Sequence, residues 1–149
     1  MQEAPMSAFK ILLLLVVSLL CAIPLRAEEP LQQTGEKLVR QLFADMKSAN
    51  IPAIKKIISP VFQSVHQDGT RNCDQQIELI KGLDMAPPVL GDFVETRNGS
   101  ILVVTYMVSV EESVGGKRLT GKPARRLSVF QDTSEGWRWV AHANLQVMQ

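Results

Sequence analysis

The sequence predicts an α+β fold in which N-terminal helices pack on one face of a strongly curved antiparallel sheet. Two observations lead to this prediction. Between residues 30 and 58, apolar residues recur at three- and four-residue spacing, as on one face of a helix. After residue 89, runs rich in Val, Ile, Thr and aromatic residues alternate with turns that contain Gly and Asn. Helices therefore come first, and a series of antiparallel strands follows.

The first 27 residues have the composition of a secretory signal peptide. Lys10 precedes an apolar run at 11–20, and Ala27 supplies a small residue at the cleavage position. The run is short for a bilayer span, which needs about 20 apolar residues. We expect cleavage after Ala27 and export to the periplasm or the exterior. A lipoprotein signal with Cys21 acylated and a retained membrane anchor are the alternatives.

Residues 28–149 are expected to form one domain. Loss of the leader removes Lys10, Arg26 and Glu3, which leaves 14 basic and 14 acidic side chains. A formal charge of zero argues against a nucleic-acid binder and against a membrane-surface domain, because both concentrate basic residues. Cys73 is then the one remaining cysteine, so we expect no internal disulfide.

The first helix is predicted over about residues 30–48. Asn50 and Pro52 then break the chain, and a short second helix at 54–58 is expected to end before Pro60. The apolar stripe of the first helix consists of Leu31, Leu38, Val39, Leu42, Phe43 and Met46.

A strand is predicted at 61–67, because β-branched and aromatic residues replace the helical spacing there. Asp68 and Gly69 are typical of a turn after it. Asn72 and Gln75 then have the spacing of a capping box, which predicts the start of a third helix.

Two hairpins are predicted in the second half. The first joins residues 89–97 to 101–112 through Asn98 and Gly99. The second lies in the stretch 125–147, where a strand at 124–131 pairs with a strand that Trp137 and Trp139 open. Both faces of residues 101–110 are largely apolar, so we expect helices on one face and a second subunit on the other.

Four segments resemble the nuclear transport factor 2-like (NTF2-like) superfamily, specifically its SnoaL-like and DUF4440-type small domains. These segments are 53–58, 62–69, 105–108 and 136–144. The resemblance covers nearly all of the chain after the leader. It implies a cone, in which a strongly bent sheet wraps around helices and leaves an open apolar cavity at the wide end. It also implies dimerisation through the sheet. Catalytic members place a carboxylate, a tyrosine or a histidine inside the cone.

Four residues are candidates for acid–base chemistry in such a cavity. His66 and His142 are the only histidines, and histidine transfers protons most readily near neutral pH. Tyr106 could donate a hydrogen bond to a ligand carbonyl. Asp92 would become a general base if it pointed into the cavity and burial raised its pKa. The alternative for each histidine and for Tyr106 is a structural role, and for Asp92 it is solvent exposure.

The candidates for ligand binding are Tyr106, Arg126, Trp139, His142 and Asn144. Arg125 and Arg126 are adjacent on a strand, so they point in opposite directions, and alternation alone does not say which faces the cavity. A buried arginine would need a carboxylate partner or an anionic ligand. No metal-ligand spacing occurs, and we expect no cofactor.

The leading functional hypothesis is an exported domain that binds a small, largely apolar organic molecule in the cavity, without a requirement for catalysis. The first alternative is an isomerase, dehydratase or hydrolase that uses histidine with tyrosine or aspartate as acid and base. The second is a homodimeric interaction module whose cavity is vestigial.

Overall fold

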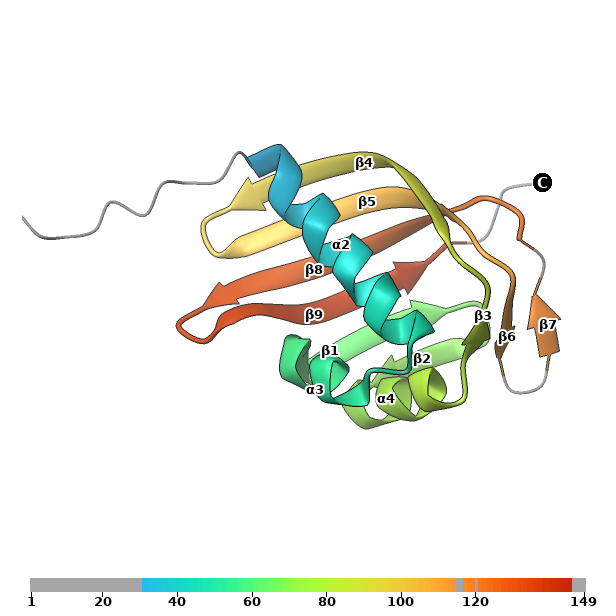
Figure 1. Cartoon of the computed structure of the whole chain (residues 1–149). Coiled ribbons are helices and arrows are strands. Elements are labelled where there is room, and N and C mark those ends of the chain that lie inside the picture. The colour runs from blue at the N-terminus through green and yellow to red at the C-terminus, as the bar shows by residue number, and fades with distance from the viewer. Residues whose placement is uncertain (1–30, 115–116, 120, 146–149) are drawn as a thin grey trace, which may run out of the picture.

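The computed structural model of the chain describes residues 31–114, 117–119 and 121–145. Helices and strands in this part of the chain form the predicted α+β arrangement, in which the helices lie on one face of a curved sheet (Figure 1). The predicted leader, with its cleavage site at Ala27 and the alternative lipidation at Cys21, lies outside the described residues. No helix among the described residues is long and apolar enough to cross a membrane.

Three helices cover the inner face of the sheet. Helix α2 spans Leu31–Lys47, α3 spans Ile51–Ile57 and α4 spans Cys73–Lys81. The predicted capping box is present at the start of α4: Asn72 accepts from the backbone N–H of Gln75, and the Gln75 side chain accepts from the Asn72 N–H. These two bonds satisfy N–H groups that the first turn of a helix leaves without partners.

The main sheet has the strand order β2-β1-β9-β8-β5-β4. A smaller sheet of three short strands, in the order β3-β6-β7, lies at the end opposite the β4–β5 and β8–β9 turns (Figure 1). The strands of the main sheet are β1 (Ile58–His66), β2 (Gly69–Asn72), β4 (Val89–Asn98), β5 (Ile101–Ser109), β8 (Ala124–Thr133) and β9 (Gly136–Asn144). Those of the smaller sheet are β3 (Asp84–Met85), β6 (Glu112–Val114) and β7 (Lys117–Leu119).

Both predicted hairpins are present, but the sheet is mixed rather than wholly antiparallel. Strand β1 runs parallel to β9, which comes last in the chain. The helices and strands between them provide the long connection that a parallel pair requires. Strand β1 also begins at Ile58, earlier than predicted. Pro60 lies where the β1–β9 register shifts, between Ile58 and Gln63, and a proline is tolerated in such an irregular part of a strand.

The strand predicted over 101–112 is two strands. Strand β5 ends at Ser109, and β6 begins at Glu112 in the smaller sheet, where it pairs with β3 and β7. The short strands β3 and β7 were not predicted, because a segment of two or three residues is too short to show the alternation of a strand. This change of sheet takes the chain from the main sheet to the wide end of the cone.

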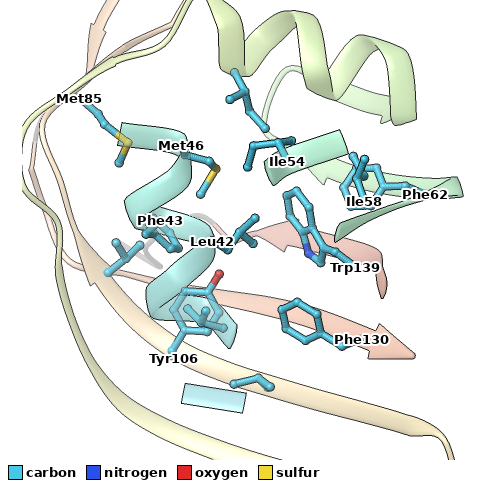
Figure 2. Close-up of a cluster of buried hydrophobic side chains, with 14 of the residues drawn as sticks. Leu42, Phe43, Met46, Ile54, Ile58, Phe62, Met85, Tyr106, Phe130 and Trp139 are labelled. Atoms are coloured by element: carbon cyan, nitrogen blue, oxygen red, sulfur yellow. The ribbon is translucent and has the colours of Figure 1, made fainter. Parts of the chain in front are cut away.

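The hydrophobic core fills the space between α2 and the sheet. Its largest fully buried side chains are Trp139, Tyr106, Phe43 and Phe130. Phe43 of α2 meets Tyr106 edge to face, with ring centroids 5.9 Å apart. Figure 2 shows Tyr106 and Trp139 extending from the sheet toward the helix that carries Leu42, Phe43 and Met46.

Candidate functional site

A cavity of about 650 Å³ opens between the helices and the wide end of the sheet. Its apolar wall comes from α2, α4 and the residues around β3 and β5. Its polar wall comes from β1, β2, β5, β6, β8 and β9. The apolar wall includes Leu42, Phe43, Met46, Leu79, Met85 and Val108. The polar wall includes His66, Arg71, Tyr106, Glu112, Arg126, His142 and Asn144.

A chain of three buried side chains crosses the inner face of the sheet. The Tyr106 hydroxyl lies 3.1 Å from Ser128 Oγ, and Ser128 Oγ lies 3.3 Å from His142 Nδ1. The strand register places these side chains together. Tyr106 of β5 is opposite Arg126 of β8, which is two positions from Ser128 on the same face, and Ser128 is opposite His142 of β9. Two of the predicted site residues are therefore linked through a serine that sequence reasoning did not single out.

A second cluster surrounds His66 at the end of β1. His66 Nε2 lies 3.2 Å from Ser64 Oγ and 3.3 Å from Gln76 Oε1, and Ser64 Oγ donates to Gln76 Oε1 at 2.9 Å. The ring centroids of His66 and His142 are 5.7 Å apart. The two predicted histidines therefore belong to one site, although 76 positions separate them in the sequence.

A β-bulge brings both Trp139 and His142 to the cavity. Phe130 pairs with Trp139 and Val129 pairs with Ala141, so Val140 is an extra residue on β9. Strict alternation would place Trp139 and His142 on opposite faces, because they are three positions apart on the strand. With the bulge, both side chains are buried on the inner face.

Arg126, and not Arg125, faces the cavity. Arg126 Nη2 donates to Glu112 Oε1 at 3.0 Å, and both side chains are largely buried. Two charges that leave water together need each other, so Glu112 is the carboxylate partner that a buried arginine was expected to have. Arg125 points outward and pairs with the exposed Asp92, with N and O 3.6 Å apart.

Asp92 therefore lies outside the cavity. It occupies an irregular part of β4, between the register positions of Gly91 and Val94, and its φ of 51° turns the backbone there. The acid–base candidates that line the cavity are His66, Tyr106 and His142.

Burial sets the protonation of the site. It holds the pKa of His142 well below its ordinary value of 6.5, and the positive charge of Arg126 acts in the same direction. Burial and then the charge of Arg71 also lower the pKa of His66. Burial raises the pKa of Tyr106 to about 12. At pH 7 the cavity therefore contains two neutral imidazoles and a neutral phenol.

Three buried donor atoms of the cavity residues have no hydrogen-bond partner among the described residues. They are Arg71 Nη1, Arg126 Nε and Trp139 Nε1. A buried donor without a partner costs about 1–3 kcal/mol, so such atoms are rare in folded proteins and often mark a site of function.

Eight polar residues of the site were not predicted: Ser64, Gln67, Asp68, Arg71, Gln76, Glu112, Lys122 and Ser128. Of these, Ser64 and Ser128 carry a sequence signal, because each is a small polar residue on a strand two positions from a buried phenylalanine, Phe62 or Phe130, and so lies on the same inward face. The described residues contain no group of three or more His, Cys, Asp or Glu side chains that could hold a metal ion.

The fold and the cavity define a class of protein, the NTF2-like cone. No family model and no curated protein matches the sequence. An NTF2-like protein from Cytophaga hutchinsonii superposes with a TM-score of 0.74 at 11% identity, over 80% of this chain and 100% of its own. A putative dehydratase of the NTF2-like family from Streptomyces avermitilis has a TM-score of 0.64 at 14% identity, over 79% and 96% of the two chains. The predicted NTF2-like fold is therefore confirmed, and the DUF4440-type assignment stays a prediction.

A third similar structure is a putative ketosteroid isomerase from Shewanella frigidimarina, with a TM-score of 0.55 at 13% identity, over 73% of this chain and 92% of its own. One of these structures is named as a dehydratase and another as a ketosteroid isomerase, although their folds agree. The shared fold alone therefore does not select a function for this chain.

Proposed function

We propose that this domain binds a small organic molecule with an apolar body in the cavity of the cone. The observation that carries the proposal is the cavity itself. Its volume of about 650 Å³ lies in the range of about 300–1,000 Å³ that is typical of small-molecule sites. An apolar wall on the helix side and a few converging polar groups on the sheet side are also the usual composition of such sites.

The open cavity favours ligand binding over an interaction module with a vestigial cavity. A module of that kind needs no internal space, and its inward side chains would pack against one another. Here the apolar side chains of α2 and α4 instead border a space that polar groups also reach. Keeping buried polar groups beside an open space costs stability, which is consistent with selection for binding.

Ligand binding is tested by thermal unfolding with a panel of small aromatic and aliphatic molecules. A ligand at 100 times its Kd stabilises the folded state by about 2.7 kcal/mol, which raises the Tm by several degrees. The replacement Leu83→Trp is expected to fill part of the cavity and abolish the shift without loss of the fold. Val94→Trp is the matched control, because Val94 is 60% exposed and lies outside the cavity.

Two results would count against the proposal. One is a panel that produces no shift in the wild-type protein. The other is an equal shift in the wild-type and Leu83→Trp proteins, because a ligand that ignores a filled cavity binds elsewhere.

Acid–base catalysis is the second candidate function. It is supported by the hydrogen-bonded chain from Tyr106 through Ser128 to His142, with His66 nearby. A neutral imidazole accepts a proton, and a neutral phenol donates a hydrogen bond to developing negative charge. Turnover of a bound ligand, lost in Tyr106→Phe and in His142→Gln, distinguishes this candidate from binding alone.

A further inference from the structure

The cavity contains hydrogen-bond donors that the protein does not satisfy. A guanidinium carries five N–H donors. Arg126 makes one side-chain hydrogen bond, to Glu112, and Arg71 makes one, to Asp68, among the described residues. Arg126 Nε, Arg71 Nη1 and Trp139 Nε1 are buried without partners in the same part of the chain. Arginine and indole nitrogens donate and never accept, so the complementary group is an acceptor.

The charges that line the cavity do not balance. Arg71, Arg126 and Lys122 are cations, and Asp68 and Glu112 are the carboxylates among the lining residues. The lowered pKa values of the two lining histidines leave them neutral at pH 7. Because Arg71 pairs with Asp68 and Arg126 pairs with Glu112, the one positive charge in excess is that of Lys122, which is exposed at the edge of the cavity. One negative charge on a ligand would balance the lining as a whole.

Arg126 lies where its unpartnered Nε donor can meet the polar end of a ligand. On β8 it is the register partner of Tyr106 on one side and of Asn144 on the other, and all three line the cavity. Its guanidinium also lies 5.7 Å from the centre of the Phe43 ring, on the apolar wall. Donors and apolar surface therefore adjoin at one place, as a molecule with an apolar body and one acceptor group requires.

We propose that the cavity selects small organic monocarboxylates with an apolar body, and that Arg126 pairs with the ligand carboxylate. This inference rests on the proposed function, because it names the ligand class of the same cavity. A carboxylate offers acceptor oxygens only, and its geometry matches the planar fork of a guanidinium. A dicarboxylate or a phosphate ester would bring more negative charge than the lining balances.

The test compares matched ligands that differ only in the head group, a carboxylate or a neutral amide. Calorimetric titration at pH 7 with 4-phenylbutanoate and octanoate, and with their primary amides, holds the apolar body constant. We expect each acid to bind at least tenfold more tightly than its amide. The double variant Arg126→Gln/Glu112→Gln removes the pair together, so that no unpaired buried charge remains, and it should bind acid and amide equally. Arg125→Gln is the control, because Arg125 faces outward, and it should keep the wild-type preference.

A further variant keeps the test decisive if the double variant fails to fold. Glu112→Gln retains Arg126 but removes its carboxylate partner, so acid binding should tighten while amide binding stays unchanged.

Amides that bind as tightly as acids would overturn the carboxylate assignment and leave the proposed small-molecule function intact. An unchanged acid preference in the double variant would overturn the role of Arg126. If neither acids nor amides bind and the broader panel also gives no shift, the proposed function itself fails, together with this inference.

Discussion

His142 is a titratable group that folding removes from water. The residue is 7% exposed, and its ring lies against Ser128 and Trp139. The cost of placing a positive charge there keeps the imidazole neutral in the folded state. The unfolded chain has no such cost, so it takes up a proton at a higher pH than the folded protein does.

Stability should therefore fall as the pH drops below about 6.5, the ordinary histidine pKa. The pKa of His142 is lower in the folded protein than in the unfolded chain. The stability that comes from keeping His142 neutral is therefore fully present above about pH 6.5 and is lost as the pH falls below it. Below the unfolded pKa, this residue reduces the free energy of unfolding by up to about 1.4 kcal/mol per pH unit. Urea unfolding at pH 7.5 and 5.5 measures the effect.

His142→Gln is the matched variant for this measurement. It should retain only the smaller pH dependence of His66, whose pKa is lowered in the same direction. A pH dependence that is undiminished in His142→Gln would contradict the assignment.

Helix α2 lies close to the sheet at Gly35. The carboxylate of Glu95 on β4 accepts hydrogen bonds from the backbone N–H groups of Gly35 and Glu36, at 2.9 and 2.8 Å. A Cβ atom added at Gly35 would lie 2.6 Å from Val104 Cγ2 and 2.7 Å from Glu95 Cδ. Since α2 supplies Leu42 and Phe43 to the cavity wall, this contact also positions one side of the candidate site.

Gly35→Ala should consequently destabilise the protein, although alanine favours a helix more than glycine does. Forcing an extra methyl group into a packed contact costs about 1–3 kcal/mol, which is more than the gain in helix propensity of about 1 kcal/mol. Chemical denaturation measures the change. Gly82→Ala is the control, because the nearest atom to a Cβ there is 3.9 Å away. Equal stability of the two variants would contradict the close approach.

The outer face of the sheet carries apolar side chains, and none of the helices that the structure describes lies on it. Every second residue of β5 faces outward and is half-buried, and Val61, Val65 and Val94 on the same sheet are 82%, 52% and 60% exposed. Apolar side chains that lie together on an exposed face are typical of an interaction site. We propose that a second copy of the chain covers it, as the sequence and the family resemblance led us to expect.

A charge at the centre of this face should separate the copies. Val129 is opposite Val103 of β5 and Ala141 of β9, in the middle of the sheet. Val129→Glu is therefore expected to give a monomer in sedimentation analysis where the wild-type chain gives a dimer. Ser134→Glu, which adds the same charge in the exposed β8–β9 turn, should remain dimeric. A wild-type chain that is monomeric at all concentrations would contradict the proposal.

The sequence by itself determined the helices, both hairpins and the capping box of α4, because periodicity and turn residues are local properties that short segments carry. It also placed His66, Tyr106, Arg126, Trp139, His142 and Asn144 among the candidates, and all of them line one cavity. Only the tertiary structure decided that Arg126 faces inward with Glu112, that Asp92 faces solvent, and that the extra residue Val140 turns Trp139 and His142 to the same side. Register, bulges and the parallel β1–β9 pairing depend on contacts between distant segments, and no local pattern encodes those contacts.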